Sequence, residues 1–259
     1  MKIKLRTLFI LVTLAIFLAV FILEPFVQRQ QEKQARGSLQ ERFGTVEFRT
    51  TNGATKTLKC VGEPGGSQSI ETKTLTVFRE LDSLELKNCH VKNTTPTTKL
   101  YIEALDLERV RLDLDIPMNN LKELIVSRSS IGIWFTPSET KLTPAGFDFR
   151  PFRNASSLES ITISNDFING FHGLESLPNL RGLSVIQAKI YSIEGIDQIE
   201  ALRSLSLTSD WQREITPSDI KILCNCQSLE FLVLSNDFDL SAIEAIKNSL
   251  PQCEILIKQ

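Results

Sequence analysis

Residues 158–179, LESITISNDFINGFHGLESLPN, and residues 180–201, LRGLSVIQAKIYSIEGIDQIEA, decide the fold of this chain. Both stretches read L-x-x-L-x-L and then place apolar residues at positions 11, 14, 17 and 20, with isoleucine, valine or phenylalanine substituting for leucine. One helix or strand does not keep such a pattern over 44 residues, whereas a stack of similar supersecondary units does. The chain is therefore predicted to be a solenoid.

Each unit is predicted to begin with a short strand. Side chains alternate along a strand, so positions 4 and 6 point into the core and positions 3, 5 and 7 point to the opposite face. The later apolar residues recur every third position, which suits tight 3₁₀-like coils on the convex side. One unit cannot bury its apolar face alone, so neighbouring units must stack and form a parallel sheet.

The same template extends over eight units along the chain. They open at Leu81, Ile102, Leu121, Leu158, Leu180, Leu202, Leu229 and Leu250. Positions 4 and 6 are Leu84 and Leu86, Leu105 and Leu107, Leu124 and Val126, Ile161 and Ile163, Leu183 and Val185, Leu205 and Leu207, Leu232 and Leu234, and Cys253 and Ile255. All sixteen are apolar, which chance does not produce when 42% of the chain is hydrophobic.

On these residues the chain resembles the leucine-rich repeat family over about residues 75–257. The resemblance implies a right-handed α/β solenoid with a curved parallel sheet and short helices or coils on its convex side. Position 9 of the family motif is usually Asn or Cys. Here it holds Cys89, Val110, Ser129, Asp166, Ala188, Asp210 and Asp237, so the side-chain ladder between turns is patchy.

Residues 1–27 are interpreted as a signal-anchor that forms one transmembrane helix. Residues 8–23 contain only one polar residue, Thr13, and as a helix they would span roughly 24 Å. The alternative is a cleaved signal peptide, but no A-x-A-like cleavage site follows the run. The short basic leading tail favours an N-terminus inside the cytoplasm. The repeat domain is therefore expected on the extracytoplasmic, periplasmic side of a bacterial inner membrane.

Three further segments follow the anchor. Residues 28–43 are rich in Gln and charge and are predicted to form a juxtamembrane helix, either a solvated spacer or a weak dimerising helix. Residues 44–74 are predicted to be an N-terminal β cap, with a hairpin turn at Asn52-Gly53. Residues 75–259 are the repeat domain, with an insertion at about 131–157. Anchor, spacer and repeats together resemble membrane-anchored leucine-rich repeat proteins of bacteria.

One convex helix is expected within the repeat domain. Thr216-Pro217 is a helix start, because Thr is a good N-cap and Pro suits the first helical position. Asp219 adds a carboxylate in the first turn, and Ile220, Leu223 and Cys226 supply an apolar face.

Charge and cysteine content restrict the classes of function. Residues 1–43 carry seven Lys or Arg and three Asp or Glu, so the rest of the chain has a net charge of −6 when the whole has −2. An acidic domain without a basic stripe argues against nucleic acid. The five cysteines fall mostly on core positions and are interpreted as small apolar residues, although one disulfide near the C-terminus stays open if the domain is exported.

No catalytic signature is found in the sequence. It contains no H-E-x-x-H, P-loop, G-x-S-x-G or dinucleotide-binding glycine loop, and only two histidines, His90 and His172. We therefore predict a non-enzymatic binding scaffold without cofactor or metal. It would recognise a protein or a cell-envelope polymer, with the bilayer contacted through residues 8–23. Alternatives are a structural subunit of a membrane complex and, with least support, an envelope hydrolase that uses an acidic pair.

The outward strand positions supply the candidate binding surface. Its floor would be small and hydroxylated, with two arginines at its edge and an apolar end. The residues are Ser160, Thr162, Ser164, Ser184, Ser204, Ser206, Arg109, Arg128 and Phe231. The alternative is a plain solvated sheet face, since fold alone does not prove a site.

The insertion supplies a second candidate, a partner loop at Trp134 and Phe135. Residues 131–157 also contain Phe147, Phe149 and Phe152. Exposed, these aromatics would anchor a protein partner; buried, they would form a local core under the insertion.

Overall fold

The structure is a computed structural model that describes residues 24–51, 54–64, 68–78, 81–92, 102–112, 120–127, 130–131, 149, 152–211 and 214–258. Within these ranges no helix has both the length and the apolar character needed to cross a membrane. The predicted anchor, residues 8–23, lies outside the described residues. Its insertion in a bilayer therefore stays a prediction.

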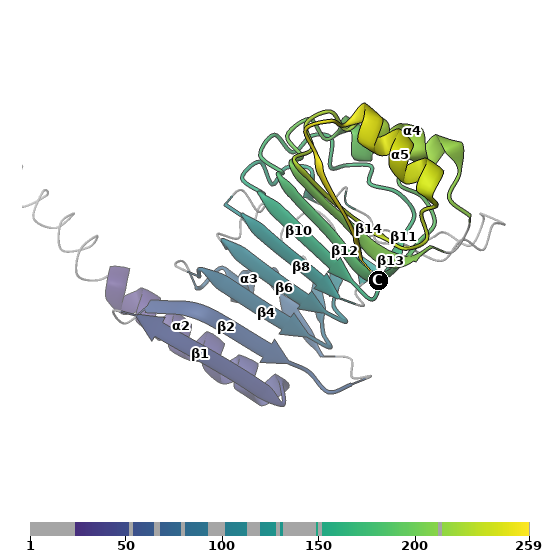
Figure 1. The fold of residues 1–259 in the computed structure, drawn as a ribbon. Coiled ribbons are helices and arrows are strands. Elements are labelled where there is room, and N and C mark those ends of the chain that lie inside the picture. The colour runs from purple at the N-terminus through teal and green to yellow at the C-terminus, as the bar shows by residue number, and fades with distance from the viewer. Residues whose placement is uncertain are drawn as a thin grey trace, which may run out of the picture.

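One long sheet forms the body of the protein (Figure 1). Its first two strands pair antiparallel and the others pair parallel, as the repeat predicts. The order is β1 (Thr45–Thr51), β2 (Ala54–Val61), β4 (Ser83–Lys87), β6 (Ala104–Glu108), β8 (Glu123–Ser127), β10 (Ser160–Ser164), β12 (Gly182–Ile190), β13 (Ser204–Trp211), β14 (Phe231–Ser235) and β15 (Glu254–Lys258), with β11 (Phe167–Ile168) beside β12.

The core consists of the inward positions of these strands, stacked in register. Leu84 lies opposite Leu105, Leu105 opposite Leu124, and the series continues to Leu232. From β4 to β14 every residue at positions 4 and 6 is at most 2% exposed. The predicted inward set is thus confirmed for seven of the eight units, and Leu58 and Cys60 of β2 extend it by one more strand.

The eighth unit has a different register from the predicted one. Ile255 pairs with Leu232 and Ile257 with Leu234, so these two isoleucines, not Cys253 and Ile255, occupy positions 4 and 6. The cause is that Cys253, Ile255 and Ile257 are apolar at every second position, so two registers that differ by two residues both place apolar residues inward. Leu250 is buried just before the strand. The first inward position of the strand, Ile255, comes five residues after Leu250, whereas it comes three residues after the opening residue in the other units.

A second, four-stranded parallel sheet was not predicted. It has the order β3 (Ser69–Glu71), β5 (His90–Lys92), β7 (Arg111–Leu112) and β9 (Ser130–Ile131). The chain reaches β5 and β7 of this sheet through turns at position 8, where Asn88 and Arg109 have φ of 51° and 54°. Asn165 and Gln187 have φ of 55° and 52° at the same position of later units, where the chain stays in the main sheet. Asn accepts this left-handed conformation readily, and the Asn88 side chain also donates to the Gly62 carbonyl at 3.2 Å.

The predicted convex helix is present as α4 (Pro217–Asn225), and its N-terminal cap is as expected. Thr216 accepts from the Asp219 backbone N–H, while the Asp219 carboxylate accepts from the Thr216 N–H at 2.8 Å. Helix α5 (Leu240–Ser249) packs beside it, and one 3₁₀ turn, η3, covers Ile196–Gln198. Leu223, Ile243 and Ile246 are buried in the common core, so both helices lie on the core side of the main sheet.

Helix α2 (Glu24–Arg42) closes the N-terminal end of the stack beside the β1–β2 hairpin, with the short helix α3 (Thr72–Leu75) nearby (Figure 1). The helix was predicted, but it is not a solvated spacer. Ala35, Leu39 and Phe43 are each at most 8% exposed and belong to the core. The predicted cap hairpin is also present, with Val46 and Phe48 packed against that core.

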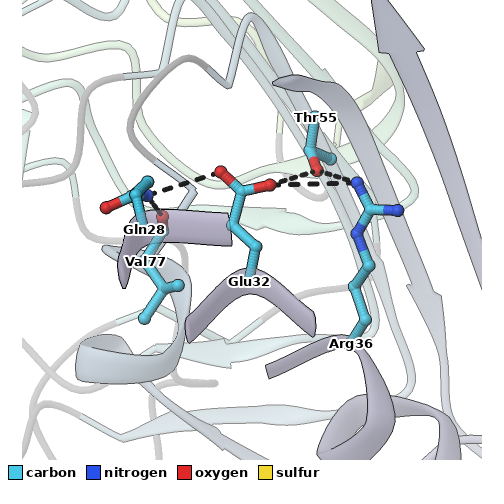
Figure 2. Close-up of polar contacts among 5 residues, drawn as sticks. All are labelled: Gln28, Glu32, Arg36, Thr55 and Val77. Carbon is cyan, nitrogen blue, oxygen red and sulfur yellow. Dashed lines mark hydrogen bonds and ion pairs between the residues drawn. The ribbon is translucent and has the colours of Figure 1, made fainter. Parts of the chain in front are cut away.

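A polar network joins α2 to the cap (Figure 2). Arg36 Nη2 donates to the Thr55 hydroxyl at 2.6 Å, and that hydroxyl donates to Glu32 at 3.3 Å. Gln28 Nε2 donates both to Glu32 and to the Val77 carbonyl. The Arg36 guanidinium lies 4.9 Å from the centre of the Phe48 ring. These contacts fix the helix on the first unit of the repeat.

Candidate binding surface on the open face of the sheet

The face of the main sheet opposite the core is called here the open face, and it consists of positions 3, 5 and 7 of strands β2 to β15. Because all these strands are in register, equivalent positions form straight rows. The middle row is Lys59, Glu85, Asp106, Ile125, Thr162, Ser184, Ser206, Val233 and Leu256. Its chemistry therefore changes along the stack from charged to hydroxylated to apolar.

The six predicted serine and threonine residues meet on three neighbouring strands. Thr162, Ser184 and Ser206 lie side by side, and Ser160 and Ser204 flank Gly182 in the row beside them. Ser204 is exposed and the other five are half-buried. A Cβ at Gly182 would meet the Ser160 Cβ only at 3.7 Å, so the glycine leaves room for a bound molecule but is not required by packing.

The apolar end of the open face is larger than predicted. Phe231 is 48% exposed, as expected, and Leu256 on the next strand is 52% exposed. Val233 lies directly opposite Leu256. Leu256 points outward in the predicted register as well, because the two registers differ by two residues, but the predicted surface ended at the strand that carries Phe231.

The predicted arginine edge is described only in part. Arg109 is exposed at the turn that follows β6, with φ 54°. Arg128 lies outside the described residues, as do Trp134, Phe135 and Phe147 of the insertion. Phe149 and Phe152 are 1% and 2% exposed, so these two aromatics of the insertion are core residues. The partner loop at Trp134 and Phe135 stays a prediction.

The charged end of the open face is a network of ion pairs. Lys59 and Lys87 lie 3.3 Å and 3.2 Å from the Glu85 carboxylate, and Lys87 also lies 2.7 Å from Glu108. Burial, and then the neighbouring Glu85 charge, raises the pKa of Asp106 above its usual value of 3.8. Glu85 and Asp106 are the adjacent carboxylates that an acidic-pair hydrolase would need, but lysines on both sides hold Glu85 in ion pairs.

Replacing Asp106 with asparagine is expected to stabilise the fold at pH 7. A raised pKa means that the folded state binds more protons than the unfolded state, so the carboxylate costs stability as the pH rises through that window. The gain in unfolding free energy should become smaller as the pH is lowered, and it should vanish below pH 3.8. Urea titrations at several pH values measure it. Glu123→Gln, which replaces an exposed carboxylate on β8, is the control and should leave the free energy of unfolding close to the wild-type value.

Titratable groups elsewhere form no reactive centre in the described residues. No group of three or more His, Cys, Asp or Glu there is placed to hold a metal ion. All five cysteines are free thiols, and burial raises the pKa of Cys60, Cys89 and Cys226 to about 12. At neutral pH these three thiols stay protonated and resemble small apolar side chains.

Comparisons with known proteins name no family for this chain. A scan against protein-family models finds no match, and neither does a search of curated proteins. Among solved structures, internalin C2 of Listeria monocytogenes is 17% identical with a TM-score of 0.44, covering 78% of this chain and 80% of that one. An internalin (inlF) of the same species is 16% identical with a TM-score of 0.47, covering 88% and 69%. A Leptospira interrogans leucine-rich repeat protein is 17% identical with a TM-score of 0.37, covering 71% and 56%.

These neighbours are leucine-rich repeat proteins. The fold of this chain is leucine-rich-repeat-like, with a mostly parallel sheet and short helices. At such identities the likeness concerns the fold alone and transfers no binding residue to this chain.

Proposed function

We propose that the chain is a non-enzymatic scaffold, displayed from a membrane anchor, that binds a protein or an envelope component through the open face. The observation that carries this proposal is the register of the main sheet. Equivalent positions of nine strands line up over a continuous core, so side chains far apart in the sequence form one preorganised surface.

A folded protein fits this surface best. Phe231 and Leu256 are large apolar side chains at its end, and such residues anchor protein partners when they enter a pocket. The neighbouring hydroxyl groups can donate and accept hydrogen bonds without the entropy cost of long side chains. Their short length lets a partner approach the strands closely.

The opposite side of the stack completes the hydrophobic core. It carries coils, the short second sheet and helices α4 and α5, whose apolar residues fill the core. The helices therefore leave the open face uncovered, since they lie across the core from it. A partner on the open face would therefore not compete with the packing of α4 and α5 against the core.

A charged side chain in the hydroxyl patch is expected to block binding. Ser184 lies between Thr162 and Ser206, and an arginine there would extend past the neighbouring hydroxyl groups into the space that a partner would occupy. We expect Ser184→Arg to weaken partner capture by about 100-fold, because it adds both a clash and an unpaired charge. The matched control is Glu244→Arg, at an exposed position of α5, and this variant should capture the partner as the wild type does. Equal capture by both variants would contradict the proposal.

Display from the membrane has its own test. A cysteine at Glu244, in a chain whose native cysteines are replaced by alanine, is treated with a membrane-impermeant thiol reagent on intact cells. Labelling is expected from the outer side of the inner membrane, because residues 8–23 would hold the N-terminus inside. Labelling only after the cytoplasm is opened would overturn the orientation and leave the open-face proposal intact.

A further inference from the structure

Strand β15 is an edge strand with an unusual composition. It reads Glu254-Ile-Leu-Ile-Lys258 and pairs with β14 along one side. No strand in the described part of the chain pairs with its other side. Leu256 is 52% exposed and Ile257 is 39% exposed, although Ile257 occupies an inward position. An exposed apolar edge with free backbone N–H and C=O groups is a template for pairing with another strand.

The two ends of the stack are treated differently. At the N-terminal end, helix α2 covers the first unit with Ala35, Leu39 and Phe43, and β1 turns a polar strand, TVEFRTT, outward. At the C-terminal end, Leu256 and Ile257 stay exposed. Covering the C-terminal edge would therefore bury more exposed apolar surface than covering the N-terminal end.

We propose that β15 pairs antiparallel with β15 of a second copy of this chain, across a two-fold axis that passes between the two Leu256 residues. The sequence of the strand is complementary to itself in this arrangement. Glu254 of each copy lies opposite Lys258 of the other, Ile255 lies opposite Ile257, and Leu256 lies opposite its own equivalent. Opposite charges and apolar pairs in directly opposed positions stabilise antiparallel strands.

The faces of the strand fit the same arrangement. Glu254, Leu256 and Lys258 continue the open face, while Ile255 and Ile257 continue the core. Opposed residues of an antiparallel pair point to the same side of the sheet. The salt bridges and the leucine pair would thus form on the open face, and the isoleucine pairs would continue the core and cover the exposed part of Ile257.

The charge pattern selects a second copy in one register. A shift by two residues would place Glu254 or Lys258 against Leu256 and lose both ion pairs, and a parallel pairing would place like charges together. The contact is isologous, so it closes as a dimer rather than growing into a fibre. The dimer would join two main sheets into one and place the two open faces on the same side. It does not depend on what the open face binds.

Charge reversal tests the arrangement. Sedimentation equilibrium of the full chain in detergent is expected to show a reversible dimer for the wild type. Glu254→Lys places lysine opposite Lys258 at two equivalent sites and should raise the dimer dissociation constant about 10-fold, with Lys258→Glu similar. The double variant E254K/K258E restores both ion pairs and should dimerise like the wild type. Lys247→Glu, an exposed charge reversal on α5, is the control and should change nothing.

A covalent readout is independent of these affinities. In a chain whose native cysteines are replaced by alanine, Leu256→Cys should form an intermolecular disulfide on mild oxidation, whereas Glu244→Cys should not. A monomer at every concentration, a dimer indifferent to Glu254→Lys, or a double variant no better than the single ones would overturn the proposal. The last result would show that the strand meets a different surface.

Discussion

Replacing Phe171 with alanine is expected to lower the free energy of unfolding by about 3–5 kcal/mol, the usual cost of removing a fully buried aromatic side chain. Phe171 is 0% exposed, and its ring stacks on that of Phe149 with centroids 5.6 Å apart. The substitution leaves a cavity where one of the central repeats meets the end of the insertion. Urea unfolding followed by circular dichroism measures the loss.

The matched control is Phe231→Ala on the open face. Phe231 is 48% exposed, so truncating it removes little buried area, and the expected loss is below about 1 kcal/mol. If the two variants lose equal stability, the assignment of core and open face is wrong. The pair also separates stability from binding, because only Phe231→Ala is expected to weaken partner capture while changing the unfolding midpoint little.

Replacing Leu39 with alanine is expected to cost about 2–5 kcal/mol. Leu39 is 2% exposed and lies between Ala35 and Phe43 on the face of α2 that covers the first repeat unit. Capping units protect the end of a solenoid core from water, so a loosened cap should destabilise the neighbouring units as well. Hydrogen exchange is expected to quicken first in α2, β1 and β2.

Leu240→Ala is the control for this variant, since Leu240 begins α5 and is 79% exposed. It should change the free energy of unfolding by less than about 0.5 kcal/mol. A Leu39→Ala protein as stable as the control would mean that α2 is a detachable spacer, as its polar sequence first indicates, and not the cap of the stack.

The repeat architecture could be predicted because each unit carries its own copy of the signal. The spacing of Leu158, Ile161 and Ile163 recurs at Leu180, Leu183 and Val185, and period-2 alternation then assigns every inward and outward position. The rows of the open face follow from the same rule, since equivalent positions of stacked units must align. The cap of α4 was predictable from purely local chemistry at Thr216, Pro217 and Asp219.

The features that were missed depend on contacts distant in the sequence. The spacing of Ala35, Leu39 and Phe43 is visible in the sequence, but the core that buries them exists only once the hairpin and the first repeat have assembled. In the last unit Cys253, Ile255 and Ile257 are apolar at every second position, so two registers two residues apart both fit, and pairing with β14 decides between them. The second sheet arises from backbone turns at position 8, which side-chain periodicity does not report.

The residues of the candidate site could be predicted from the sequence, but the exposure of each side chain could not. The sequence identifies which residues share the open face. The structure adds that Leu256 belongs to it and that Lys59 and Lys87 form ion pairs with Glu85 and Glu108. Local patterns do not determine exposure, which depends on the neighbouring strand. This is why Phe149 and Phe152, grouped by sequence with Trp134 and Phe135, could be either loop anchors or core residues before their burial was known.

A photo-crosslinking comparison of the two sides of the stack tests the central claim most directly. A photoreactive amino acid is placed at Ser184 on the open face in one full-length chain and at Glu244 on α5 in another, and both are irradiated in the cells that make them. The account predicts one dominant protein adduct from position 184 and none of that mass from position 244. The same adduct from both positions, or from position 244 alone, would contradict it.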